Sequence, residues 1–371
     1  MKSLCFTPII ATIIFSLTSW SEMSYTDDGY RIPTEYPLFV FPRDHGSHPE
    51  FRIEWWYITG HLHAANKDRY GFQATFFRYA LKPNADEGSN EFGDEHIYMA
   101  HMALSDIEQE EFYHEERLNR DGWDAYCSIE KMDMQNGNWT LQQDAEDRIG
   151  LVATIQEEVQ LNLTLEPSQP HVTFGEKGLS KKGAEQSACS WYITYPRLQV
   201  VGNIILNNKT IDIKGEAWMD HEISSSQLSE KQVGWDWLSV RFNDQTELML
   251  YILRDVDGNP DPHSKLVWIS NDGILTHMGP DEFTWTTLRR WRSPESQSNY
   301  PVENTLSGLR PDGSPYQLHI KPLFDEQELT GELGGIAYWE GACDILENGD
   351  QIGEAYMELT GYNESLESQL R

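Results

Sequence analysis

The feature that most restricts the fold of this chain is a hydrophobic alternation of period two in short, turn-separated segments. In residues 157–165 (EEVQLNLTL) every hydrophobic side chain occupies an odd-numbered position, and residues 211–219 alternate in the same way. Residues 248–253 (LMLYIL) are wholly apolar, as in a strand covered on both faces. The pattern predicts an all-β protein of antiparallel sandwich or barrel type. One helical alternative is residues 105–108 (SDIE), which resemble a capping box ahead of an acidic run to Arg117.

Two parts of the chain repeat one succession of segments. The motif GEAWMD at 215–220 returns as GEAYME at 353–358. Each is preceded by a tryptophan-rich segment, EWWY at 54–57 and GWDW at 234–237, and each of these leads into an apolar segment that ends on arginine. We interpret the echo as two related β-barrels, with chance similarity among strand residues as the alternative.

The length of 371 residues corresponds to two or three domains. The repeat predicts two antiparallel β-barrel domains in tandem, over residues 35–223 and 230–371, joined through the serines at 224–226.

The charge balance excludes one class of partner. With 28 Lys+Arg against 60 Asp+Glu the net charge is −32, so a nucleic acid would be repelled and an anionic membrane surface is disfavoured. The 13 Trp, 17 Tyr and 14 Phe are too many large apolar rings for a disordered chain. The sequence therefore predicts a folded protein with a solvated acidic surface.

The N-terminus resembles a secretory signal peptide over residues 1–22. Lys2 precedes an almost uncharged run with an apolar centre and small residues at its end. The apolar centre is short for a membrane span, although an uncleaved tether is the alternative. Cys5 lies before the apolar run, so no lipoprotein anchor is indicated. We expect a periplasmic or secreted protein.

Three cysteines remain after the leader, namely Cys127, Cys189 and Cys343. They allow at most one disulfide bond, whose pairing the sequence leaves open, and no CxxC spacing points to zinc. A nucleophilic Cys343 is conceivable, but a small buried thiol is the simpler interpretation.

The tryptophan-rich segments place acids among apolar side chains. If residues 54–63 form a strand, Glu54 and Trp56 share one face, while Trp55 and Tyr57 share the other. In the second half, Asp236 falls on an apolar face. Such carboxyls are either paired in a buried salt bridge, with Arg78 and Arg254 as candidate partners, or they are functional.

The segment 218–222 (WMDHE) is the densest chemical cluster, with three adjacent titratable side chains before a serine-rich loop. We expect it at a barrel mouth, with His221 and Asp220 on opposite faces of the strand. The alternative is a strand end whose acid caps the next loop.

No cofactor is expected. Histidines such as His101 invite a metal hypothesis, but no convergent ligand spacing is present, so we expect no metal site. A nucleophile elbow, a Walker loop and a dinucleotide fingerprint are all missing from the sequence.

Three groups of motifs resemble the AttH-like family, relatives of the acyclic carotenoid 1,2-hydratases that are also described as predicted secreted hydrolases. The motifs are DHGSHP at 44–49 with EWWYITGHL at 54–62, GEAWMDHE at 215–222 with GWDW at 234–237, and YWEGACD at 338–344 with YMELTGY at 356–362. The resemblance covers about residues 35 to 365. It implies two lipocalin-like barrels, export, and association with an ABC transporter of the lipoprotein-release type. Fungal relatives catalyse cycloadditions, so the scaffold does not determine the reaction.

The expected function is that of an exported protein that binds an apolar, isoprenoid- or lipid-like molecule and acts on it as a hydratase or a hydrolase. If hydratase chemistry applies, a carboxylic acid in an apolar barrel protonates an isolated double bond and π-faces stabilise the resulting cation. We expect Asp220 to be this acid, with His221 orienting it or activating the water. Glu54 and Asp236 are the reserve candidates. The expected substrate-binding residues are Trp55, Trp56, Tyr57, Arg78, His101, Trp218, Trp235, Trp237, Tyr338 and Glu340.

Two further functions remain open. The first is a non-catalytic carrier, or an accessory subunit that presents a lipophilic molecule to an ABC transporter permease. The second is a barrel packed solid that serves as a structural or partner-binding module. The substrate, the oligomeric state and the position of any cavity, in a barrel or between the barrels, are left open by the sequence.

Overall fold

The computed structural model describes residues 23–83, 95–122, 124–331 and 337–366. Within these residues the chain is almost entirely antiparallel β-structure, with one 3₁₀ turn (η1, Arg43–His45) and no α-helix. The expectation of an all-β fold is confirmed. No helix in the described part of the chain is long and apolar enough to cross a membrane. The expected signal peptide lies outside the described residues.

The N-terminal half forms one 13-stranded sheet in the order β4-β3-β2-β1-β13-β12-β9-β8-β7-β6-β5, with β10 and β11 paired to β12. Its strands are β1 Ile53–Ala64, β2 Arg69–Ala80, β3 His96–Asp106, β4 Glu111–Arg120, β5 Ala125–Cys127, β6 Asp133–Asn136, β7 Trp139–Gln143, β8 Ile149–Ile155, β9 Val159–Pro167, β10 Val172–Thr173, β11 Ser180–Lys181, β12 Cys189–Leu206 and β13 Lys209–Ser226.

The C-terminal half forms a 10-stranded sheet in the order β17-β16-β15-β14-β23-β22-β20-β19-β18, with β21 paired to β22. Its strands are β14 Gln232–Phe242, β15 Glu247–Asp255, β16 Lys265–Ile269, β17 Leu275–Met278, β18 Phe283–Arg292, β19 Asn299–Leu309, β20 Pro315–Pro322, β21 Glu328–Thr330, β22 Ala337–Glu347 and β23 Asp350–Leu359.

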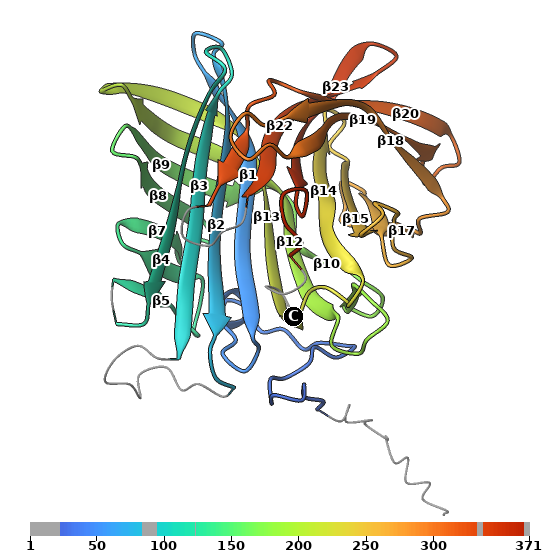
Figure 1. Ribbon diagram of the computed structural model, residues 1–371. Helices are drawn as coiled ribbons and strands as arrows, with labels where there is room; N and C mark the ends of the chain where they lie inside the picture. The colour runs from blue at the N-terminus through green and yellow to red at the C-terminus, as the bar shows by residue number, and fades with distance from the viewer. Residues whose placement is uncertain (1–22, 84–94, 123, 332–336, 367–371) are drawn as a thin grey trace, which may run out of the picture.

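The sequence echo corresponds to one repeated arrangement of strands. In the first sheet the tryptophan-rich β1 lies between its hairpin partner β2 and the Gly-Glu-Ala strand β13. In the second sheet β14 lies in the same way between β15 and β23. The two halves are therefore tandem lipocalin-like units, the first a nearly closed barrel and the second a half-barrel. Figure 1 shows them side by side, the first in blue to green and the second in yellow to red.

The helical alternative at 105–108 is wrong. Ser105 and Asp106 end β3, a short turn follows, and the acidic run forms β4, which pairs with β3 along its whole length. A capping motif is a local preference, and here the cross-strand pairing of the barrel overrides it.

The first barrel is filled by apolar side chains that alternate inward along its strands, and side chains of its edge strand β4 reach β6 and β7 near the other end of the sheet. Arg117 of β4 donates to the carbonyl of Asn136 and lies over the ring of Trp139 at 3.9 Å. Asn119 donates to the side chain of Asn136 at 2.6 Å. These side-chain contacts connect the two ends of the sheet, so the barrel closes without a continuous backbone ladder.

The two sheets pack against each other through β1, β2, β3 and β13 of the first and β14, β15, β22 and β23 of the second. The apolar run in β15 is buried on both faces as expected, because Leu248 and Leu250 enter the core of the half-barrel while Met249 and Tyr251 face the first sheet. The sheets approach each other closely at Gly71, where a Cβ atom would lie 2.8 Å from the Cβ of Ala342. Cys127, Cys189 and Cys343 are buried, and none of them forms a disulfide bond within the described residues.

Candidate functional site

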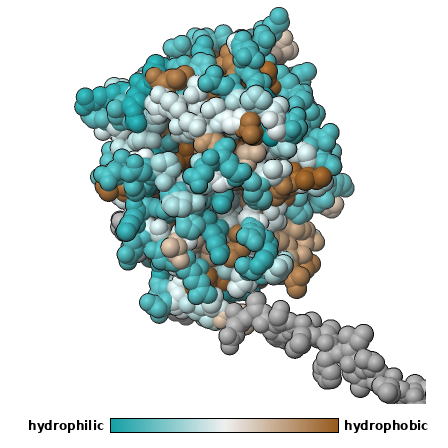
Figure 2. Space-filling view, turned by 90° about the vertical axis from the view of Figure 1, so that its right-hand side faces the viewer, coloured by the Kyte–Doolittle hydropathy of each residue, from teal (hydrophilic) through white to brown (hydrophobic). Residues whose placement is uncertain are grey.

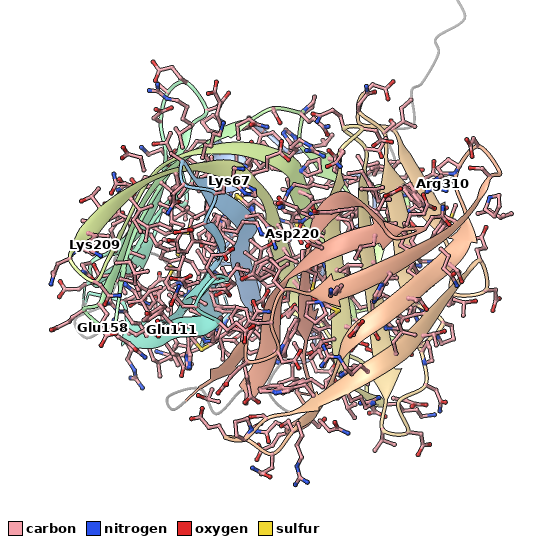
Figure 3. The ribbon with its side chains drawn as sticks, turned by 90° about the horizontal axis from the view of Figure 1, so that it is seen from above. Lys67, Glu111, Glu158, Lys209, Asp220 and Arg310 are labelled. Atoms are coloured by element: carbon pink, nitrogen blue, oxygen red, sulfur yellow. The ribbon has the colours of Figure 1, made fainter. Side chains whose placement is uncertain are left out.

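A cavity of about 390 Å³ lies between the two sheets. Its volume falls within the range of small-molecule sites. Its walls are mostly apolar and include Trp55, Phe77, Met99, Trp235, Trp237 and Leu253. The cavity therefore lies between the two units and not inside either barrel. Figure 3 places Asp220 near the centre of the molecule, where the two sheets meet, with Lys209 and Arg310 toward the outer edges.

The alternation of β1 decides which of its side chains reach this cavity. Trp55 and Tyr57 line it, whereas Trp56 faces the barrel interior, where it is completely buried and stacks on His221 at 4.6 Å between ring centroids. This is the division of faces that a period of two predicts.

Asp220 of β13 lies on the cavity wall, beside Tyr57 in the sheet register. Its Oδ1 accepts hydrogen bonds from the Thr194 hydroxyl at 2.6 Å and the Trp218 indole at 2.8 Å, and its Oδ2 accepts one from the Tyr192 hydroxyl at 2.6 Å. Burial raises the pKa of Asp220 to about 7, although the three donors oppose the shift. The carboxyl can therefore hold or release a proton near neutral pH.

A second carboxyl, the half-buried Glu358 of β23, lines the opposite wall. It accepts a hydrogen bond from the Trp235 indole at 2.8 Å, and burial, helped by the charges of Asp220 and Glu222, raises its pKa to about 7. Glu340, its neighbour on β22, accepts a hydrogen bond from Tyr57 at 2.5 Å. Burial raises the pKa of Glu340 well above its usual value, which favours the protonated form of this carboxyl.

The ammonium group in the lining is already paired. The Lys182 ammonium lies 3.1 Å from the carboxylate of Glu222. Glu222 lies on the same face of β13 as Asp220, and it also lines the cavity. The Lys182 ammonium also lies over the rings of Tyr192 and Tyr251, at 4.6 and 4.4 Å from their centroids. The ion pair and the two π-faces neutralise this cation within the wall.

His101 and Tyr338 form a separate polar contact across the sheets. The Tyr338 hydroxyl lies 2.7 Å from Nδ1 of His101, and both side chains line the cavity. In the first sheet His101 pairs with Thr75, Thr75 pairs with Tyr57, and Tyr57 pairs with Asp220. His101 is therefore three strands away from Asp220, a separation of roughly 14 Å at the usual distance between strands. The cavity thus has polar groups at two positions separated by apolar wall.

Glu54 lies on the other side of β1, inside the barrel, in a buried charged cluster. Its carboxylate bonds to His48 and His221 at 2.8 Å and to the Arg78 guanidinium at 3.2 Å. Burial opposes ionisation, but His48, His221 and Arg78 together hold the pKa of Glu54 well below its usual range. The cluster anchors the segment before β1 to the barrel.

Among the described residues, His48, Glu54 and His221 are the group whose ligand atoms could hold a metal ion, all lying within 4.8 Å of one another. Arg78 already carries the positive charge that balances Glu54, and Asp44 accepts from the other nitrogen of His48 at 3.2 Å. This donor set suits an ion-pair network better than a divalent cation.

The structure distributes the expected site residues among the cavity, the barrel interior and the half-barrel. Seven line the cavity: Trp55, Tyr57, His101, Asp220, Trp235, Trp237 and Tyr338. Trp218 and Glu340 contact this group through Asp220 and Tyr57. Glu54, Trp56, Arg78 and His221 belong to the barrel interior, and Asp236 faces the half-barrel, where it pairs with Arg254 at 2.9 Å.

Two details differ from expectation. His221 does not orient Asp220 as expected: the two side chains point to opposite faces of β13, as the alternation predicted, and His221 bonds to Glu54 instead. The placement of residues 218–222 at a barrel mouth is also wrong, since β13 continues to Ser226.

Sequence reasoning passed over Glu358, Lys182 and Tyr192 as site residues. Glu358 carried a signal, because it occupies the position of Asp220 in the repeated motif, GEAYME against GEAWMD. Lys182 and Tyr192 lie outside the repeat, and only the folding of β11 and β12 over the cavity brings them to it.

The two tandem sheets and the enclosed aromatic space between them define a two-unit lipocalin-like protein with a cavity of ligand size. A family model described as AttH-like matches residues 33–362, and the chain belongs to the AttH-like family. A crystal structure assigned as AttH from Nitrosomonas europaea is 33% identical, with a TM-score of 0.79, covering 88% of this chain and 98% of that one.

Two more distant structures share the fold. Kievitone hydratase from Nectria haematococca is 13% identical, with a TM-score of 0.66, covering 92% of this chain and 99% of its own. CghA, solved with Sch210972, is 8% identical, with a TM-score of 0.52, covering 92% and 98%. The search of curated proteins found no match.

Proposed function

We propose that this protein is an exported enzyme that binds an isoprenoid- or lipid-like molecule between its two sheets and adds water to a double bond. The observation that carries the proposal is Asp220, a completely buried carboxyl with a pKa of about 7, in the wall of an aromatic cavity. An acid that is neutral until needed is what protonation of an alkene requires.

In the proposed reaction one carboxyl, that of Asp220, both donates a proton and recovers one. The π electrons of the double bond take the proton of Asp220, which forms a C–H bond and leaves a tertiary cation beside the new carboxylate. Water attacks the cation, forms the C–O bond and returns a proton to Asp220. The hydroxyls of Tyr192 and Thr194 can turn to donate or accept, so both protonation states of Asp220 keep partners.

Aromatic faces on the cavity wall stabilise the cation. Trp235 and Trp237 line the cavity and supply such faces. Trp56 and Trp218 were expected beside them, but neither belongs to the lining. Glu358 provides a second carboxyl opposite Asp220, and its negative charge, when ionised, favours a cation as well.

The named hydratase among the structural relatives is consistent with this proposal. Kievitone hydratase is by name a hydratase, and it shares the fold at 13% identity. That likeness shows the fold alone, so the reaction proposed for this chain depends on its own cavity and acid.

The second candidate function is that of a non-catalytic carrier, which would deliver the lipophilic molecule to an ABC transporter permease. The three hydrogen bonds that hold Asp220 favour it, because donors arranged around both oxygens stabilise an ionised, structural carboxylate. Export is part of both proposals and is tested by fractionating cells that express the full chain.

Native mass spectrometry of protein purified from its own host, followed by organic extraction, tests both. A bound apolar molecule at one per chain supports a lipophile site and identifies its class. Turnover of that molecule is then compared between wild type, Asp220→Asn and the surface control Asp257→Asn. Loss of turnover by Asp220→Asn alone supports the enzyme, whereas retention of the ligand without turnover in any protein supports the carrier.

A further inference from the structure

Gln227 holds a buried polar group in the cavity that the proposed reaction does not use. It directly follows the last residue of β13, it is 4% exposed, and it lines the cavity. Within the described residues its side-chain nitrogen Nε2 has no hydrogen-bond partner. Buried amides are nearly always satisfied, so this nitrogen points to a partner supplied by whatever fills the cavity.

Most of the other polar groups in the cavity wall already have partners within the protein. Asp220 accepts from three donors, Glu358 accepts from Trp235, and Lys182 pairs with Glu222. The Tyr192 hydroxyl accepts from the Trp237 indole at 3.0 Å. Among the described lining residues, two side-chain nitrogens have no hydrogen-bond partner: Nε2 of His101, which lies 3.6 Å from the Glu116 carboxylate, and Nε2 of Gln227. The His101 nitrogen has this acid beside it, so Gln227 is the group left to recognise a ligand.

The charges of the lining restrict what that ligand can be. Asp220, Glu222 and Glu358 all line the cavity, and the ammonium of Lys182 is neutralised by Glu222. A carboxylate or phosphate head group would lose its hydration beside three acids without gaining a free cation among the described lining residues. An anionic lipid is disfavoured on this ground.

We propose that the ligand is an uncharged isoprenoid- or lipid-like molecule with one hydroxyl or carbonyl oxygen, and that the amide of Gln227 binds this oxygen and selects it. The inference rests on the proposed apolar-ligand function and names its substrate class. A hydroxyl fits especially well, because it can accept from Nε2 and can also donate to Oε1 when the amide is turned over.

Three probes with one carbon skeleton test the proposal, namely farnesol, the hydrocarbon farnesene and ionised farnesoic acid at pH 8. Binding is followed through the fluorescence of the cavity tryptophans Trp55, Trp235 and Trp237. In the wild type, farnesol is expected to bind at least about 3-fold more tightly than farnesene, and farnesoic acid most weakly.

The variant Gln227→Met keeps the length of the side chain and removes the amide. It is expected to weaken farnesol binding about 3- to 10-fold and to leave farnesene binding unchanged or tighter. Gln317→Met, an exposed glutamine of β20, is the matched control and should change neither affinity.

Each result decides the question. Equal binding of farnesol and farnesene by the wild type, or unchanged farnesol binding by Gln227→Met, overturns the role of Gln227 and leaves the apolar cavity standing, with a water molecule as the partner of the amide. Binding of none of the three probes overturns the inference together with the proposed function. The comparison of probes in the wild type needs no variant, so it holds even if Gln227→Met fails to fold.

Discussion

Replacing Asp220 by asparagine should remove the proposed catalytic acid. It should also remove a pH-dependent loss in the free energy of unfolding. The pKa of this carboxyl is raised from 3.8 to about 7 because the group is buried. The folded protein therefore keeps its proton to a higher pH than the unfolded chain does. As a result, the free energy of unfolding falls as the pH rises between these two values and then levels off.

The size of the effect follows from the shift. At about 1.36 kcal/mol per pKa unit, the full cost of ionising Asp220 in the folded protein is ~4 kcal/mol, of which about 2–3 kcal/mol develops between pH 5 and pH 8. Asparagine has nearly the same shape, and its oxygen can accept from Thr194 and Trp218, while its NH₂ group faces the Tyr192 hydroxyl, which can turn to accept. The rearranged hydrogen bond costs about 1 kcal/mol.

Thermal unfolding at pH 5 and pH 8 measures the difference. The midpoints of wild type and Asp220→Asn should be similar at pH 5, and that of the variant should be the higher one at pH 8. Asp236→Asn is the matched control: it leaves Arg254 without its partner at 2.9 Å, so it should be destabilised by about 3–5 kcal/mol at both pH values. If the midpoints of wild type and Asp220→Asn fall in parallel between pH 5 and pH 8, the raised pKa is refuted.

Three further changes test the surroundings of the site. Glu54→Gln breaks the buried cluster with Arg78 and should lower the free energy of unfolding by about 3–5 kcal/mol without opening the cavity. Denaturant unfolding measures the change, and a loss of less than about 1 kcal/mol would contradict the assigned ion pair. Trp235→Phe removes the donor that lowers the pKa of Glu358, so infrared titration of that carboxyl should show a higher pKa, and a lower one would refute the contact. Tyr57→Phe leaves Glu340 without its donor and should destabilise the protein by about 1–3 kcal/mol in the same unfolding assay.

The local pattern was a sound guide to strands and faces. The period of two along β1 assigned Trp55 and Tyr57 to one face and Glu54 to the other, and it also set Asp220 and His221 apart on β13. These predictions hold because side-chain direction along a strand is a property of the strand itself. The same reasoning made Arg78 a candidate partner for Glu54, because it lies directly opposite in the hairpin.

Local pattern failed where pairing with other strands decided the result. The capping motif at 105–108 indicated a helix, yet the acidic run after it became β4 because β3 offered a full ladder of partners. The role given to His221 rested on its place next to Asp220 in the chain. Neighbours in a strand point apart, so the nearest residue in sequence is on the wrong face to assist.

The exterior conforms to what composition implied. Figure 2 shows a face that is mainly hydrophilic, with apolar residues in small separate groups, in keeping with the net charge of −32. The strongly apolar surfaces of the chain are turned inward, into the barrel, the half-barrel and the space between the two sheets.

By itself the sequence determined the strand class, the two related halves, the family and the two faces of each tryptophan-rich strand, because these depend on residue type and spacing along the chain. Only the tertiary structure decided that the faces carrying Trp55 and Trp235 meet, that Glu358 stands opposite Asp220, and that Gln227 is left without a partner. Those relations arise when two sheets from distant parts of the chain pack together. The burial that raises the pKa of each acid exists only after that packing.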